Sequence, residues 1–187
     1  MSPELIDAVR RRALDPTRRT DNCEFYIPEI GAALTDVQLA ESRARLGFAP
    51  PADLVALYRS VGNGGYGPEY GLLGLEGGDT DEDGQTAVDL YLSFRETDPD
   101  HPGWAWPEGL LPIADLGCAM RVCLDCSDGS GRLLLFEPNV LDERHLTKDA
   151  LFPMAETLSD WLAIWAAGEK TWRTVEAALA ARGDQPQ

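Results

Sequence analysis

The glycine-rich segment VGNGGYGPEYGLLGL, residues 61–75, constrains the fold more than any other stretch of the chain. It contains GNGGYG, which matches the G-x-G-x-x-G fingerprint of dinucleotide-binding proteins. That motif binds pyrophosphate only where it leaves a strand and opens a helix. Here residues 51–61 have a helical pattern, and a short apolar extended stretch follows the glycines. The order helix, glycine turn, extended segment argues against a dinucleotide site. It predicts a helix end and a turn in which Gly64 or Gly65 has a left-handed backbone.

The flanking sequence predicts an α+β protein. Capping residues and apolar periodicity predict helices over residues 2–15, 35–46, 51–61, 157–167 and 169–182. Alternating apolar residues predict a strand over 87–94, AVDLYLSF. Three apolar segments predict strands over 109–117, 119–127 and 131–138, the last two as a hairpin around Ser127–Gly131. We therefore expect a single domain with a mainly antiparallel central sheet and helices before and after it. Residues 1–20 should form an arginine-rich N-terminal extension that lies apart from the domain, residues 21–187.

The charge of the chain favours a cationic partner. The formal net charge is −16, although residues 1–19 carry five arginines against three acidic residues. A field of this sign repels phosphate backbones and anionic membranes, so we expect neither nucleic acid nor membrane as a partner. The same acidity also serves solubility, and that alternative stays open.

The sequence predicts a cytoplasmic protein. The N-terminus has no apolar region typical of a signal peptide, and the apolar runs are far shorter than a membrane span. In that compartment the four cysteines would be reduced thiols. The sequence does not indicate the oligomeric state.

Two patterns suggest metal binding, and each has a simpler interpretation. Asp79–Gly84, DTDEDG, matches the start of an EF-hand loop, but the twelfth position is Leu90 and the flanks are expected to be extended. An exposed acidic turn explains the same residues. Cys118, Cys123 and Cys126 are better explained as buried thiols than as metal ligands, because two of them should point to opposite faces of a strand.

Motifs of catalytic sites are not found in the sequence. It contains no G-x-S-x-G, H-E-x-x-H or Walker motif, and His101 lies among acids without an accompanying nucleophile. We expect no catalytic residues, no cofactor and no metal.

The order of these segments resembles the SUKH superfamily, which includes the SMI/KNR cell-wall assembly regulator domains. The resemblance covers residues 28–166. It is carried by IGAALTDVQLAESRARLGFAPPADLVALYRSVGNGG, LLPIADLG, AMRVCLDCS, GRLLLFEP and DWLAIW. It implies an α+β domain without enzymatic chemistry, which in bacteria is most often an immunity protein that neutralises a toxin encoded next to it. The alternatives are a scaffold domain, as in fungal members, and a small metal-dependent hydrolase built from Asp79, Asp81, Asp83 and His101.

A basic toxin is therefore the expected partner. Acidic residues should accelerate its association, and aromatic residues outside the periodic core stripes should anchor it. The acidic candidates are Asp79, Asp81, Asp83, Asp98 and Asp100, and the aromatic candidates are Tyr66, Tyr70, Trp104 and Trp106. Core packing is the alternative role of each aromatic residue.

Overall fold

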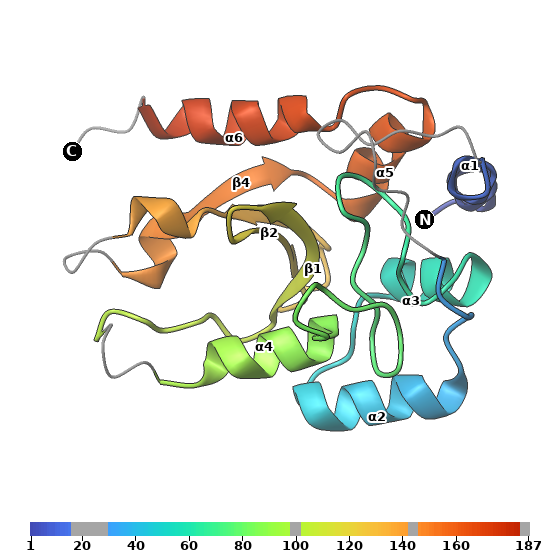
Figure 1. Ribbon diagram of the computed structural model, residues 1–187, viewed down its shortest axis with the longest axis horizontal. Helices are drawn as coiled ribbons and strands as arrows, with labels where there is room; N and C mark the ends of the chain where they lie inside the picture. Colours follow the sequence, from blue (N-terminus) through green and yellow to red (C-terminus); the bar gives the residue numbers. More distant parts are fainter. Residues whose placement is uncertain (16–29, 98–101, 142–145, 184–187) are drawn as a thin grey trace.

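A four-stranded antiparallel sheet forms the centre of the protein (Figure 1). The structure is a computed structural model that describes residues 1–15, 30–97, 102–141 and 146–183. The strands lie in the sheet in chain order: β1 (Leu110–Gly117), β2 (Met120–Asp125), β3 (Leu133–Phe136) and β4 (Leu151–Ala155). The α-helices are α1 (Pro3–Ala13), α2 (Asp36–Leu46), α3 (Ala52–Ser60), α4 (Ala87–Arg95), α5 (Leu158–Ala166) and α6 (Trp172–Gly183). Two short 3-10 helices, η1 (Pro138–Val140) and η2 (Thr147–Ala150), precede β4. The expected α+β class is confirmed.

Helices α1 to α3 begin and end within two residues of the bounds that the sequence predicts. The Ser2 side chain caps α1, and Thr35 and Gln38 form a reciprocal capping box at the start of α2. Gly47 ends α2 in a left-handed conformation with φ +80°. These local hydrogen bonds define the helix boundaries without help from tertiary contacts.

Helix α4 corrects the strand predicted over residues 87–94. Thr86 accepts a hydrogen bond from the Asp89 backbone N–H, and the Asp89 carboxylate accepts one from the Thr86 backbone N–H. This capping box starts a helix. The buried residues Ala87, Val88, Leu90 and Tyr91 share one helical face, so the apolar pattern fitted both periods. The prediction of a strand was wrong because it ignored the cap.

The predicted strands of the sheet are confirmed, and β4 is an addition. The hairpin around Ser127–Gly131 joins β2 to β3, with Cys123 opposite Leu134. The segment LFPMA was not singled out in the sequence, and it contains Pro153. Proline is tolerated on an edge strand, because the position of its missing N–H can face away from the neighbouring strand and no hydrogen bond between the strands is lost. β4 is such an edge, pairing only with β3 among the described residues.

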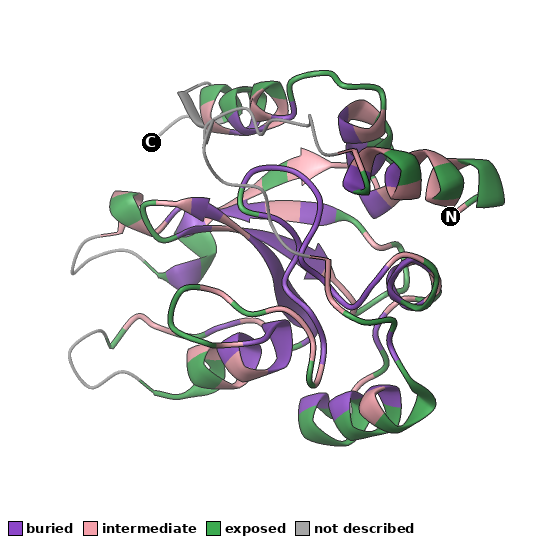
Figure 2. Ribbon diagram, turned by 45° about the vertical axis from the view of Figure 1, so that its right-hand side comes forward, coloured by how far each residue is buried: buried purple, intermediate pink, exposed green. Residues whose placement is uncertain are grey.

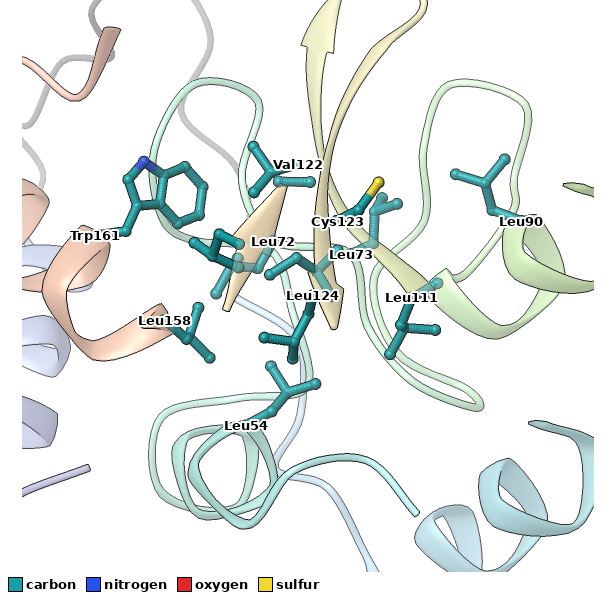
Figure 3. Close-up of a cluster of buried hydrophobic side chains, with 14 of the residues drawn as sticks. Leu54, Leu72, Leu73, Leu90, Leu111, Val122, Cys123, Leu124, Leu158 and Trp161 are labelled. Atoms are coloured by element: carbon teal, nitrogen blue, oxygen red, sulfur yellow. The ribbon is translucent and has the colours of Figure 1, made fainter. Parts of the chain in front are cut away.

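The hydrophobic core lies between the sheet and the helices around it. Figure 3 shows Leu54 of α3, Leu124 of β2 and Trp161 of α5 converging around Leu72 of the glycine-rich segment, and all four are fully buried. Buried residues concentrate on the sheet and on the inner faces of the helices, whereas exposed residues cover the outer faces (Figure 2). The glycine-rich segment therefore passes through the centre of the molecule.

Glycine is required in this segment because two backbones pass close together. A Cβ atom at Gly62 would lie 2.4 Å from the Gly31 carbonyl oxygen. Gly64 and Gly65 have φ of +89° and +80°, which confirms the left-handed backbone predicted for this turn. The Asn63 side chain is buried beside this turn, and it accepts a hydrogen bond from the Leu75 N–H at 2.9 Å. The glycines thus act in packing.

The N-terminal helix packs on the body of the protein instead of standing apart from it. Helix α1 lies against α5 and buries Val9 and Ala13 completely. Arg10 donates a hydrogen bond of 2.8 Å to the Ser60 carbonyl at the end of α3, and the Arg12 guanidinium lies 5.2 Å from the Trp165 ring centroid. The boundary expected at residue 20 lies outside the described residues, so the division into 1–20 and 21–187 stays a prediction.

Candidate partner-binding surface

A hollow of about 480 Å³ opens between the β1–β2 turn and the loop that leads into α4. Tyr70 and Gly71 line it from the glycine-rich segment. Its lining also includes Leu73, Thr80, Asp81, Glu82, Asp115, Gly117 and Cys118. We call this site the acidic hollow, because three of its lining residues are carboxylates. It brings together two residues that the sequence marked as partner-binding candidates, Tyr70 and Asp81.

The hydrogen bonds of β1 bring these segments together. The Leu73 N–H donates to the Ile113 carbonyl at 2.8 Å, and Leu72 forms an isolated bridge with Ala114. These contacts hold the glycine-rich segment along the outer side of β1. The Tyr70 ring consequently lies over the end of β1, where a Cβ atom at Gly117 would be 3.4 Å from its Cε2 atom.

Asp81, Asp115 and Arg121 form an ion-pair network beside the acidic hollow. Arg121 Nη1 donates to Asp115 Oδ1 at 2.8 Å, and Arg121 Nη2 lies 4.0 Å from Asp81 Oδ2. The side chains are 13%, 15% and 1% exposed for Arg121, Asp115 and Asp81 respectively. Burial of this kind strengthens electrostatic attraction and raises the cost of an unsatisfied polar atom. The network therefore places two carboxylates and one guanidinium in a largely buried position, and it leaves Asp81 Oδ2 and Arg121 Nε without a hydrogen-bond partner among the described residues.

The turn beside the acidic hollow has an unusual backbone. Cys118 and Ala119 connect β1 to β2 with φ of +50° and +64°. A two-residue hairpin with positive φ at both positions normally takes Asn-Gly or Asp-Gly, so cysteine and alanine are strained here. Two side chains support the turn: Asp115 Oδ1 accepts from the Gly117 N–H at 2.6 Å, and Asn139 donates to the Cys118 carbonyl at 3.0 Å.

The aromatic candidates divide into surface and core residues. Tyr70 is 39% exposed, whereas Tyr66 and Trp106 are 0% and 2% exposed. Their side chains are enclosed by the core, which favours the alternative role of core packing for Tyr66 and Trp106, and their contact with a partner stays an untested prediction. Trp104 is half-buried: it stacks on Trp106 with 5.9 Å between ring centroids and donates from Nε1 to the Phe94 carbonyl. Among the four, Tyr70 presents the most exposed ring.

The acidic candidates are spread around the loop before α4. Asp79 is half-buried under the glycine-rich segment, and Asp83 is exposed. Asp81 Oδ1 accepts hydrogen bonds from the backbone N–H groups of Asp83 and Gln85, which closes the loop on itself. Asp98, Asp100 and the alternative catalytic residue His101 lie outside the described residues. The role of these acids in partner binding stays a prediction.

The cysteines occupy three different environments. Cys123 is buried, and burial raises the pKa of its thiol well above the ordinary value. Cys126 is half-buried, and burial raises the pKa of its thiol to about 12. Both thiols are therefore packing groups, as expected. Cys118 is exposed in the β1–β2 turn, so the expectation that all three are buried was wrong for this residue.

Potential metal ligands do not gather in the described part of the chain. Within it, no three His, Cys, Asp or Glu side chains are placed to hold one ion. The loop Asp79–Gly84 is followed by helix α4 and not by the extended segment expected there, and its twelfth position, Leu90, is a buried residue of that helix.

Sequence reasoning missed Asp115 and Arg121 as members of the site. Neither residue is among the candidates that the sequence suggests. Asp115 lies opposite Arg121 because the pairing of β1 with β2 shifts by one residue between Asp115 and Gly117. A regular two-residue turn at Cys118 and Ala119 would instead pair Leu116 with Arg121, so the sequence carried no signal for this pair.

The fold and site define an acidic α+β protein with a charged hollow at one edge of its sheet. The family model described as the SMI1 / KNR4 family (SUKH-1) matches residues 33–164, and the chain belongs to this family. A search of curated proteins gave no match. The family match covers α2 to α4 and the whole sheet, reaches into α5, and ends before α6. None of the helices in the described residues is both long and apolar enough to cross a membrane.

Proposed function

We propose that this chain is a non-enzymatic binding protein that acts in the cytoplasm as the immunity partner of a toxin. The observation that carries the proposal is membership of the SMI1 / KNR4 family (SUKH-1) over residues 33–164. Binding would neutralise the toxin by covering or distorting its active site.

The charge of the chain supports a basic toxin as the partner. The net charge is −16, and Asp81, Glu82 and Asp115 concentrate part of it around the acidic hollow. Charges of one sign at an interface mainly raise the association rate, because they steer the encounter of the two proteins. Association should therefore slow as salt screens the field, over a Debye length of about 8 Å at physiological ionic strength.

Growth rescue by co-expression tests the proposal. Domains encoded by the genes adjacent to this one are expressed alone and together with the chain. We expect one domain to arrest growth, the chain to restore it, and the two to co-purify as a complex. The proposal fails if a toxic neighbour is found whose toxicity this chain leaves unchanged.

The salt dependence of binding in the purified complex then tests whether the acidic residues act on the association rate or on the dissociation rate. Neutralising Asp81 and Asp83 together should lower the association rate and change the dissociation rate less. Glu176, exposed on α6, provides a control for charge removal at a distance from the hollow. An association rate that is the same in dilute and physiological salt would contradict electrostatic steering.

A further inference from the structure

We propose that the acidic hollow accepts an arginine side chain of the partner protein. The inference rests on the proposed function and names the chemistry by which the partner is held. The hollow volume of about 480 Å³ lies in the range of sites that enclose small organic groups.

The first argument is an excess of negative charge. Asp81, Glu82 and Asp115 line the acidic hollow, and Arg121 is the cation paired with it. Arg121 Nη1 donates to Asp115 and to the Met120 carbonyl, whereas its buried Nε has no hydrogen-bond partner among the described residues. Glu82 is exposed and forms no hydrogen bond or ion pair with the described residues. Three carboxylates therefore line a hollow that has one guanidinium beside it.

The second argument is a buried oxygen that lacks a hydrogen-bond donor. The Asp81 side chain lines the acidic hollow and is 1% exposed, so it lies at the base of that hollow. Its Oδ2 atom accepts no hydrogen bond from the described residues, and the 4.0 Å to Arg121 Nη2 is too long for one. A buried carboxylate oxygen without a donor is costly. A donor that enters the hollow would satisfy it.

The third argument selects arginine over lysine. Tyr70 lines the hollow together with the carboxylates and is 39% exposed, so an aromatic ring borders the space that a ligand would enter. A guanidinium is planar, stacks on aromatic rings and donates two parallel hydrogen bonds to a carboxylate. A lysine ammonium would be attracted by the negative charge, but it is not planar and would neither stack on the ring nor donate two parallel hydrogen bonds to one carboxylate. The Tyr70 ring, the exposed Glu82 carboxylate and the buried Asp81 Oδ2 together fit an arginine side chain.

Titration of the ¹⁵N-labelled protein with N-acetyl-arginine amide tests the inference directly. The backbone amides of Tyr70, Gly71, Glu82 and Gly117 should shift in a saturable way, with a dissociation constant on the order of millimolar for so small a ligand. The neutral isostere N-acetyl-citrulline amide should leave them unchanged, and N-acetyl-lysine amide should bind more weakly.

Substitutions locate the site. Asp81→Asn should abolish saturation, and Glu82→Gln and Tyr70→Ala should each weaken binding by roughly two- to fivefold, the equivalent of one exposed ion pair or cation–π contact. The matched control Glu176→Gln removes the same charge on α6 and should leave binding unchanged. The native spectrum of each variant verifies its fold.

Three results would overturn the inference: no saturable shift at these amides, equal shifts with the citrulline compound, or equal affinity for the lysine compound. Each of them leaves growth rescue by the intact chain unaffected. Failure of the arginine site and failure of the immunity function are therefore distinguishable.

Discussion

Substitution of Gly64 by alanine should destabilise the protein by about 2–5 kcal/mol. The backbone φ of +89° costs a residue with a Cβ roughly 1–2 kcal/mol. In addition, the new Cβ would lie 2.6 Å from the Gly74 nitrogen and 2.8 Å from the Leu72 carbonyl oxygen. Backbone atoms cannot rotate away, so overpacking adds about 1–3 kcal/mol.

Gly47→Ala provides the matched control. Gly47 has a similar φ of +80° at the end of α2, but a Cβ there meets no atom within 4 Å. Gly47→Ala should therefore lower the free energy of unfolding only by the cost of the positive φ, about 1–2 kcal/mol.

Urea unfolding followed by tryptophan fluorescence gives both free energies of unfolding by linear extrapolation. Equal losses for Gly64→Ala and Gly47→Ala would refute the argument that close backbone approach fixes glycine at position 64. Addition of NAD should leave the thermal midpoint of the unsubstituted protein unchanged, because the residues of the GNGGYG motif, Gly62–Gly67, are buried.

Local contacts lead to three more predictions. Thr86→Ala should cost about 1 kcal/mol in urea unfolding, because it removes the capping box of α4; no loss would mean that packing alone starts this helix. Trp106→Ala should cost about 3–5 kcal/mol, and Trp104→Ala, at a half-buried position, should cost less by thermal unfolding; the reverse order would contradict the assignment of Trp106 to the core. Burial tends to raise the pKa of Asp89, but hydrogen bonds from Thr86 and Arg45 outweigh it and lower that pKa. The stability from Asp89 is therefore present above the ordinary pKa and lost as the pH falls through the lowered value, so Asp89→Asn should flatten the decline of stability below about pH 4.

Most of the fold could be predicted because its signals are local. Capping at Ser2 and Thr35 and the apolar segments of β1 to β3 each lie within a few residues. The failures came from ambiguous local signals. Residues 87–94 carry apolar positions that fit a period of two as well as a helix, and only the cap at Thr86 separates the two. β4 is a strand of five residues with Pro153 at its centre, and such a segment is recognised as a strand only once its edge position in the sheet is known.

The acidic hollow could be predicted only in part because it is assembled by tertiary contacts. Tyr70 and Asp81 were candidates for reasons of composition, but Asp115 and Arg121 join them through the register of the β1–β2 hairpin. The core positions of Tyr66 and Trp106 depend on the path of the chain across the sheet. Aromatic side chains in glycine- or proline-rich loops give no periodicity from which burial could be inferred.

The placement of α6 along β4 bears on how this protein resists self-association. An uncovered edge strand offers a row of free backbone groups to which another chain can add, and such addition leads to aggregation. The glycine-rich segment lies along the β1 edge, where the Leu73 N–H donates to the Ile113 carbonyl. On the β4 edge, Pro153 lacks an N–H group and helix α6 packs against the strand. Figure 1 shows α6 running beside β4, and the buried residues of this helix include Val175 and Ala178. A chain that ended with the family match would lack this helix beside β4, and we expect its β4 edge to be more open to other chains.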